Sequence, residues 1–338
     1  MADLIHVFIL TQSPIPEPFI QTLRGVSPRL SIRHHTANTL DELGEVWADV
    51  EVLYTTSLLP MPEQAPRLRW VQGHFAGVDQ VIDHPIVARV RLTTTSGIHA
   101  VNMGEYTLMM MLAFAHRLPG MLEHQARAEW PKDRWRLFVP RELRESTVGI
   151  VGYGSIGREV ARLAKACGMR VLASKRDPQR RVDDGWRLAG TGDPDGVGVD
   201  RLYSHTALRE MLPECDYVVV AAPLTPETRG LIGAENLHLM KRDAVLINVA
   251  RGGVVDQAAL VEALKGGVIG GAALDVFATE PLPSNSPLWR LPNVIISPHI
   301  SGFTPHYDER AMTLFADNLR RYVNGESLLN EVNLTRGF

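Results

Sequence analysis

Residues 146–168 read STVGIVGYGSIGREVARLAKACG, and this stretch decides the fold. The apolar run at 147–151 predicts a buried strand, and residues 158–167 predict an amphipathic helix that is closed by Gly168. Between them the glycines follow the GxGxxG pattern, which permits a tight turn and close backbone approach. A pyrophosphate could then lie on the helix N-terminus, so the context predicts a dinucleotide-binding turn. The alternative is a tight strand-to-helix turn that holds no ligand.

The rest of the chain repeats this alternation of strand and helix, which predicts parallel α/β units. The segment at 177–200 is rich in Gly, Asp and Arg and lacks a period, so it is expected to be a surface insertion. A long helix is expected at 99–127, with a bend at Gly120, and a last helix at 308–325 that packs back on the first domain. Strands are expected at 4–10, 52–54, 68–71, 90–93, 171–173, 216–222, 244–249, 271–274 and 294–296.

Length and composition fit an ordinary globular protein. The 338 residues are enough for two domains, and 45% of them are hydrophobic and 22% charged. The net charge of -3 gives no reason to expect nucleic acid or a membrane as partner. Cys167 and Cys215 form no metal-ligand spacing, so no metal site is expected and a reducing compartment is favoured. The N-terminus lacks signal-peptide features and no apolar run reaches about 20 residues, which together predict a cytoplasmic protein.

Four polar side chains follow predicted strands in the second half of the chain. Arg251 lies in INVARGGVVD, Asp275 ends AALDV, Glu280 lies in the turn after it, and His299 follows NVIISP. Ligands of an open parallel sheet bind at the carboxyl ends of its strands. One cation, one carboxylate and one imidazole are the groups needed to reduce a 2-keto acid. Each has a plainer alternative, namely a surface ion pair, a turn cap, a solvated carboxylate or a structural histidine.

The residues that end the strand after the glycine turn bear on the choice of cofactor. An acidic side chain there would accept hydrogen bonds from the ribose hydroxyls of NAD. This chain has Ser174, Lys175 and Arg176 instead, and their hydroxyl and two cations favour the 2′-phosphate of NADP. A solvated basic turn is the alternative, and NAD stays open.

With these residues placed, the chain resembles the D-isomer-specific 2-hydroxyacid dehydrogenases over nearly its whole length. The matching runs are FAGVD at 75–79, VGIVGYGSIG at 148–157, PLTPETRGLI at 223–232, LINVARGGVVDQAAL at 246–260, GAALDVFATEPLP at 271–283 and NVIISPHISGFT at 293–304. Lys175 departs from the acid typical of NAD-using members, and the 177–200 insertion lengthens the segment after it.

The resemblance implies two doubly wound parallel-sheet domains. A Rossmann-type dinucleotide-binding domain at 99–303 would be inserted in a flavodoxin-like substrate domain formed by 1–98 and 304–338. It also implies a homodimer that associates through the long helix after His99. The catalytic residues would be Arg251, Glu280 and His299, and the substrate would touch Phe75, Ala76, Gly77, Arg251 and His299. The cofactor would touch Gly152, Gly154, Ser155, Ile156, Gly157, Ser174, Lys175, Arg176, Ala222, Pro223, Thr228, Val249, Ala250, Arg251, Asp275, His299 and Gly302.

The expected activity is NAD(P)-dependent reduction of a small 2-keto acid of the glyoxylate or hydroxypyruvate type, or the reverse oxidation. Arg251 would bind the substrate carboxylate, His299 would act as general acid, and Glu280 would keep that imidazole charged. Two alternatives stay open. One is an NAD-linked phosphoglycerate or lactate dehydrogenase, and the other is a non-catalytic dinucleotide-sensing protein of the same fold. The sequence does not choose the 2-hydroxy acid.

Overall fold

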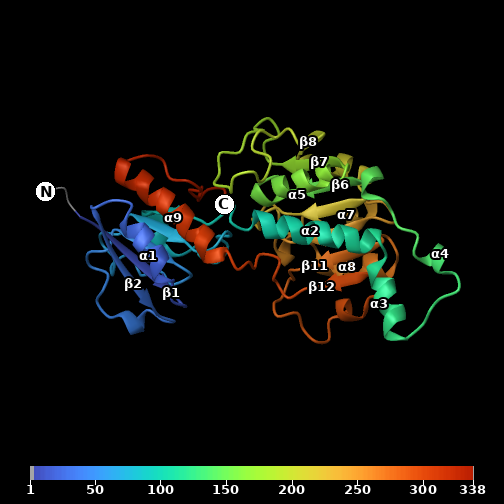
Figure 1. Cartoon of the computed structure of the whole chain (residues 1–338), viewed down its shortest axis with the longest axis horizontal. Helices are drawn as coiled ribbons and strands as arrows, with labels where there is room; N and C mark the ends of the chain where they lie inside the picture. The colour runs from blue at the N-terminus through green and yellow to red at the C-terminus, as the bar shows by residue number, and fades with distance from the viewer. Residues whose placement is uncertain (1–3, 338) are drawn as a thin grey trace. The chain divides into compact units, whose positions relative to one another are not determined.

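The computed structural model describes residues 4–337. Their contacts divide the chain into two compact units, Met1–Ile98 with Thr304–Phe338, and His99–Phe303. Each unit is built on one sheet whose paired strands all run parallel (Figure 1).

The smaller unit has a five-stranded sheet with the order β2-β1-β3-β4-β5. This is the flavodoxin-like strand order. Helices α1 (Glu17–Arg24) and α9 (Tyr307–Asn324) cover one face, where Ile20, Leu23, Met312 and Phe315 share a core with the sheet. The strands are β1 Ile5–Thr11, β2 Leu30–Thr36, β3 Val52–Thr55, β4 Trp70–Gly73 and β5 Arg91–Thr93.

The larger unit has a seven-stranded sheet with the order β12-β11-β10-β9-β6-β7-β8. The order reverses between β6 and β9, so the turn after β6 lies at the point where doubly wound sheets bind ligands. The strands are β6 Thr147–Val151, β7 Arg170–Lys175, β8 Arg201–Ser204, β9 Tyr217–Val220, β10 Val245–Asn248, β11 Gly271–Leu274 and β12 Val294–Ile296.

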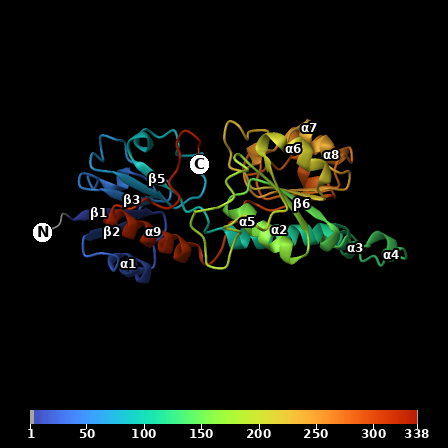
Figure 2. The ribbon, with the colours of Figure 1, turned by 90° about the horizontal axis from the view of Figure 1, so that it is seen from above.

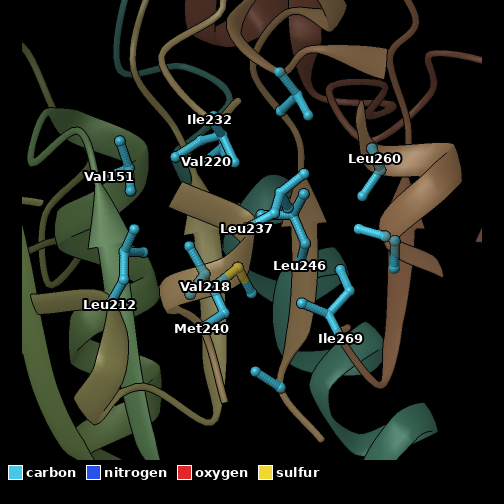
Figure 3. Packing of buried hydrophobic residues seen from close by; sticks show 14 of the residues in the cluster. Val151, Leu212, Val218, Val220, Ile232, Leu237, Met240, Leu246, Leu260 and Ile269 are labelled. Atoms are coloured by element: carbon cyan, nitrogen blue, oxygen red, sulfur yellow. The ribbon is translucent and has the colours of Figure 1, made fainter. Parts of the chain in front are cut away.

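Helices cover both faces of this sheet (Figure 2). On one face lie α2 (Ala100–Ala115) and α5 (Ser155–Ala166), and on the other lie α6 (Leu208–Met211), α7 (Ala234–Leu239) and α8 (Gln257–Lys265). Figure 3 shows the hydrophobic core between the sheet and α6, α7 and α8. There Val218 and Leu246 of adjacent strands pack with Leu237 and Leu260 of the helices. Helices α3 (Leu118–Ala126) and α4 (Arg134–Leu137) project from the sheet in both views.

The predicted fold class is confirmed, with corrections to its elements. The expected helix at 99–127 is two helices, because Arg117 adopts a left-handed conformation (φ 58°) and breaks it before Gly120. Helix α5 begins at Ser155, inside the glycine turn, and not at Arg158. Strands β2 and β8 were not predicted, and both lie at a sheet edge. The remaining strands differ from the expected ranges by no more than two residues at either end.

Candidate active site

Glu280 and His299 form a hydrogen-bonded pair in the larger unit. His299 Nδ1 lies 2.7 Å from Glu280 Oε2, and the side chains are 48% and 35% exposed. The other oxygen, Glu280 Oε1, accepts a hydrogen bond of 2.9 Å from the Phe277 amide, which fixes the carboxylate. Because Nδ1 faces the carboxylate, Nε2 is the ring nitrogen left to exchange a proton with another molecule.

Asp275 holds the loop that carries His299. It follows β11 directly, is completely buried, and its backbone carbonyl accepts from the His299 amide at 2.9 Å. Its carboxylate accepts from the Ile300 and Ser301 amides, both at 2.9 Å. His299 itself has a φ of 54°, a left-handed conformation that a non-glycine residue adopts at a cost. The charge-assisted hydrogen bonds of Asp275 offset that cost and fix the direction of the imidazole.

A second chain of hydrogen bonds connects this loop to helix α2. Ser297 Oγ donates to Asp275 Oδ1 at 2.5 Å, and Tyr106 OH lies 2.6 Å from the same hydroxyl. Burial raises the pKa of Tyr106 to about 12, so its hydroxyl stays protonated at ordinary pH. His99 and Asn102 add contacts to the carbonyls of Gly302 and Ser301. Ser297 and Tyr106 were missed in the sequence, because only the folded chain brings them together.

Arg251 lies in a turn after β10. The Asn248 side chain and the backbone of Phe277 hold this turn in place. The buried Asn248 side chain accepts from the Ala250 amide and donates to the Arg251 carbonyl, both at 3.1 Å. A Cβ on Gly252 would lie 1.9 Å from the backbone of Phe277, so this residue must be glycine. The turn that carries Arg251 therefore lies directly against the segment that holds Glu280. Asn248 is a positioning residue that was missed, although its place at the end of β10 was a usable signal.

The glycine turn after β6 has the shape of a dinucleotide site. Gly152 has a φ of 104°, and a Cβ there would lie 2.5 Å from the Ala222 amide nitrogen. A Cβ on Gly157 would lie 2.2 Å from the Gly152 carbonyl oxygen. By contrast, a Cβ on Gly154 would meet nothing within 4 Å, so there is open space above the N-terminus of α5. The N-cap residue Gly154 has no side chain to accept from the first amides of α5, so these amides can bind an anion.

A second observation fits the adenosine end of a dinucleotide. Ser174 is 1% exposed, and its hydroxyl has no hydrogen-bond partner within the described part of the chain. A buried polar group without a partner is rare. This hydroxyl lies on β7 opposite Val151, the last residue of the strand before the glycine turn. The residues present therefore fit a nicotinamide dinucleotide.

The two cations after Ser174 both have protein partners. Lys175 Nζ donates to the Arg180 carbonyl at 2.7 Å, and Arg176 pairs with Glu227 at 2.5 Å. Burial lowers the pKa of Lys175, and the nearby Arg158 lowers it further. A lysine ammonium carries three donors, so the bond to one carbonyl leaves two.

The other residues predicted to contact the cofactor or the substrate lie in two regions, one in each unit. Ala222 and Val249 are buried after β9 and β10, and Thr228 Oγ1 donates to the Pro223 carbonyl at 2.6 Å. Phe75, Ala76 and Gly77 belong to the smaller unit, after β4. There the Phe75 ring lies over Gly73, where a Cβ would come within 2.4 Å of it.

Residues 4–337 contain neither a metal-ligand cluster nor a membrane-spanning helix. No group of three or more His, Cys, Asp or Glu side chains among them is arranged to hold a metal ion. Nor does any helix in that range have the length and apolar character to cross a membrane.

The chain is similar to a known protein family and to named proteins of other organisms. Residues 108–301 match the family model described as D-isomer specific 2-hydroxyacid dehydrogenase, NAD binding domain. A glyoxylate reductase of Aeropyrum pernix is 36% identical over 280 residues, which cover 80% of this chain and 78% of that protein. A D-3-phosphoglycerate dehydrogenase of Methanocaldococcus jannaschii is 32% identical over 97% of this chain, which spans 60% of that protein's length.

A solved structure agrees in fold along the whole chain. It is a D-isomer specific 2-hydroxyacid dehydrogenase from Xanthobacter autotrophicus in complex with NADPH and MES. Its TM-score is 0.81 at 32% identity, with 100% of both chains covered. The chain therefore belongs to the family of D-isomer specific 2-hydroxyacid dehydrogenases, which are NAD(P)-dependent oxidoreductases.

Proposed function

We propose that the protein reduces a small 2-keto acid of the glyoxylate or hydroxypyruvate type, with NADPH preferred over NADH. The observation that carries this proposal is the 2.7 Å pair of His299 and Glu280 on loops that follow neighbouring strands of the dinucleotide-binding sheet. An imidazole held by a carboxylate through Nδ1 presents Nε2 as a proton donor.

The catalytic roles follow from the chemistry of three side chains. The Arg251 guanidinium binds the substrate carboxylate in a planar two-pronged contact and polarises the neighbouring ketone. When bound, the reduced nicotinamide supplies a hydride to the carbonyl carbon. The carbonyl oxygen takes a proton from Nε2 of protonated His299, which completes the 2-hydroxy acid and leaves the imidazole neutral. The family resemblance implies the D configuration for a product that is chiral at this carbon. Glu280 favours the protonated imidazole and holds it in one orientation.

Binding of the dinucleotide is assigned to the larger unit, and the smaller unit is proposed to contribute to the substrate site. The amides of Gly154, Ser155 and Ile156 would hold the pyrophosphate, and Ser174, Lys175 and Arg176 would hold the 2′-phosphate. The crystallised relative with NADPH supports this choice. Assignment of Phe75, Ala76 and Gly77 to the substrate carboxylate rests on the sequence resemblance.

Helices α2, α3 and α4 are proposed to form the surface of a homodimer. They expose Met109 by 51%, Leu122 by 53% and Trp135 by 78%. Large apolar side chains exposed on three consecutive helices are typical of an interaction site. A cytoplasmic location is also proposed, because Cys167 and Cys215 are both free thiols.

The deciding experiment is a panel of 2-keto acids tested with NADPH and NADH on the purified protein. Glyoxylate or hydroxypyruvate with NADPH should give the highest kcat/KM. The relative in Methanocaldococcus jannaschii favours one further candidate, phosphoglycerate oxidation, which the same panel tests in reverse with NAD. A protein that binds NADPH but turns over no member of the panel would instead be a dinucleotide-sensing protein.

A further inference from the structure

The segment at 177–200 has no regular secondary structure but is held firmly against the larger unit. It joins β7 to β8 as an irregular loop (Figure 1). Asp193, Val199 and Trp186 within it are only 6%, 5% and 9% exposed. The backbone N–H and C=O groups of an irregular loop cannot pair within a helix or a sheet. A loop in a fixed position therefore needs hydrogen-bond partners from other parts of the chain.

Arg158 is the main partner of this segment. It follows Gly157 of the dinucleotide-binding turn and is 2% exposed. Its Nη1 donates to the Asp193 carbonyl, and its Nη2 donates to the Arg181 carbonyl at 2.6 Å. Its Nε lies 3.7 Å from Asp183 Oδ2. A guanidinium buried this deeply is tolerated only when it is paired and hydrogen-bonded, and the segment provides every one of these contacts.

Tyr153 reinforces the same attachment from inside the glycine turn. Its ring lies under the guanidinium, with the Arg158 Cζ 4.6 Å from the ring centroid. Its hydroxyl donates to Asp193 Oδ2, and the Asp193 carboxylate in turn accepts from the Val197 and Gly198 amides, each at 2.9 Å. The GxGxxG pattern requires neither a tyrosine at 153 nor an arginine at 158. These two side chains therefore hold residues 177–200 in place and are not needed to form the glycine turn.

The attachment continues to the residue proposed to bind the 2′-phosphate. Arg158 holds the Arg181 carbonyl, and Lys175 Nζ holds the carbonyl of Arg180, the preceding residue. The position of the Lys175 ammonium at the end of β7 thus depends on a stretch of chain that Arg158 fixes. Ser155 and Arg158 also line a small pocket together with Arg187, Gly192 and Pro194 of the segment.

We propose that Arg158 is a positioning residue for NADPH. It holds residues 177–200 against the dinucleotide-binding turn, and the segment in turn holds Lys175 where the 2′-phosphate binds. The inference rests on the proposed preference for NADPH. A preorganised site loses less entropy on binding, so release of the segment weakens cofactor binding without disturbing the reacting groups.

The first test measures kinetics in Arg158→Met, which keeps the bulk of the side chain but removes its donors. The KM for NADPH should rise about tenfold, equivalent to about 1.4 kcal/mol of binding free energy. The KM for NADH and the kcat at saturating NADPH should change less than about twofold. Arg170→Met is the control, since Arg170 lies on β7 and its ion pair is with Glu214, which is outside the segment. Equal changes in both KM values, or none, would overturn the inference.

The second test measures how fast trypsin cleaves the segment in a limited digestion. Trypsin cleaves after arginine, and Arg180, Arg181 and Arg187 lie within residues 177–200. Cleavage there should be faster in Arg158→Met than in wild type and Arg170→Met. Should Arg158→Met fail to fold, Tyr153→Phe keeps the ring but loses the bond to Asp193 and should show the same changes more weakly. A wild type that uses NADH better than NADPH would refute the proposed cofactor preference alone. The digestion then decides separately whether Arg158 holds residues 177–200 in place: faster cleavage in Arg158→Met supports this, and unchanged cleavage overturns it.

Discussion

His299 Nδ1 and Glu280 Oε2 lie 2.7 Å apart although the two residues are 19 positions apart in the chain. The contact exists because β11 and β12 are parallel neighbours, so the loops that leave their carboxyl ends meet at one edge of the sheet. Asp275 then turns the second loop back through its bonds to Ile300 and Ser301.

Replacement of Glu280 by glutamine tests the electrostatic part of this pair. The carboxylate favours the protonated imidazole, and the neutral amide does not. The kcat for keto-acid reduction should therefore be lower in Glu280→Gln than in wild type, measured at saturating substrate and cofactor at one fixed pH. Glu309→Gln is a matched control, because Glu309 pairs with the exposed His306 at 3.1 Å. Equal kcat values for wild type and Glu280→Gln would remove Glu280 from the mechanism.

Replacement of Arg251 by lysine tests the substrate clamp. An ammonium keeps the charge but cannot reproduce a planar two-pronged contact with a carboxylate. The KM for the keto acid should rise and kcat should fall, whereas Arg290→Lys, at an exposed position, should leave both unchanged. Unaltered constants in Arg251→Lys would show that the carboxylate is anchored elsewhere.

Replacement of Asp275 by asparagine tests the support of the catalytic loop. A neutral amide cannot match the charge-assisted bonds of a buried carboxylate, and each such bond contributes about 1.5–3 kcal/mol. A loss of about 2 kcal/mol in the free energy of unfolding should lower the Tm by about 4–8 °C in a unit of this size. We also expect a lower kcat. Asp243→Asn, which alters a carboxylate that is 65% exposed, is the control. A variant with the wild-type Tm and kcat would mean that the loop is held without Asp275.

Much of the fold could be predicted because the central strands are continuous apolar runs. Strands such as β9 and β10 are buried on both faces, so their composition alone marks them. The edge strand β2 reads LSIRHHT and is partly exposed, and it lacks that signal. The predicted end of α2 was wrong because the helix is interrupted by the left-handed backbone of Arg117. In the sequence, Pro119 and Gly120 were the residues expected to interrupt it.

The candidate site could be predicted only as a set of residue types at strand ends. The positions of Arg251, Asp275 and His299 follow from the rule that ligands bind at the carboxyl edge of a parallel sheet. The contacts that orient them do not follow from it, since Asn248, Ser297 and Tyr106 act through hydrogen bonds set by the folded backbone. The attachment of residues 177–200 by Arg158 was hidden for the same reason: a buried arginine and an exposed one look alike in a sequence.

The lowered pKa of Lys175 predicts how NADPH use depends on pH. Burial and the neighbouring Arg158 both disfavour the charged ammonium, so this lysine loses its proton at a lower pH than an exposed lysine does. Only the protonated form attracts the 2′-phosphate. The KM for NADPH should therefore rise as the pH increases into the alkaline range, while the KM for NADH stays flat. In Lys175→Asp the ratio of kcat/KM for NADPH over NADH should fall and lose this dependence, and an unchanged ratio would contradict the assignment.

The central claim is that His299 donates the proton in a keto-acid reduction, and it is tested most directly by kcat in His299→Ala. The assay is oxidation of NADPH in the presence of glyoxylate, with NADPH binding measured separately by fluorescence. We predict that kcat falls by about 10²–10⁴-fold, the contribution typical of a positioned acid, while the Kd for NADPH is unchanged. His306→Ala, which alters another exposed histidine paired with a glutamate, should keep the wild-type kcat. A near-normal kcat in His299→Ala would contradict the account.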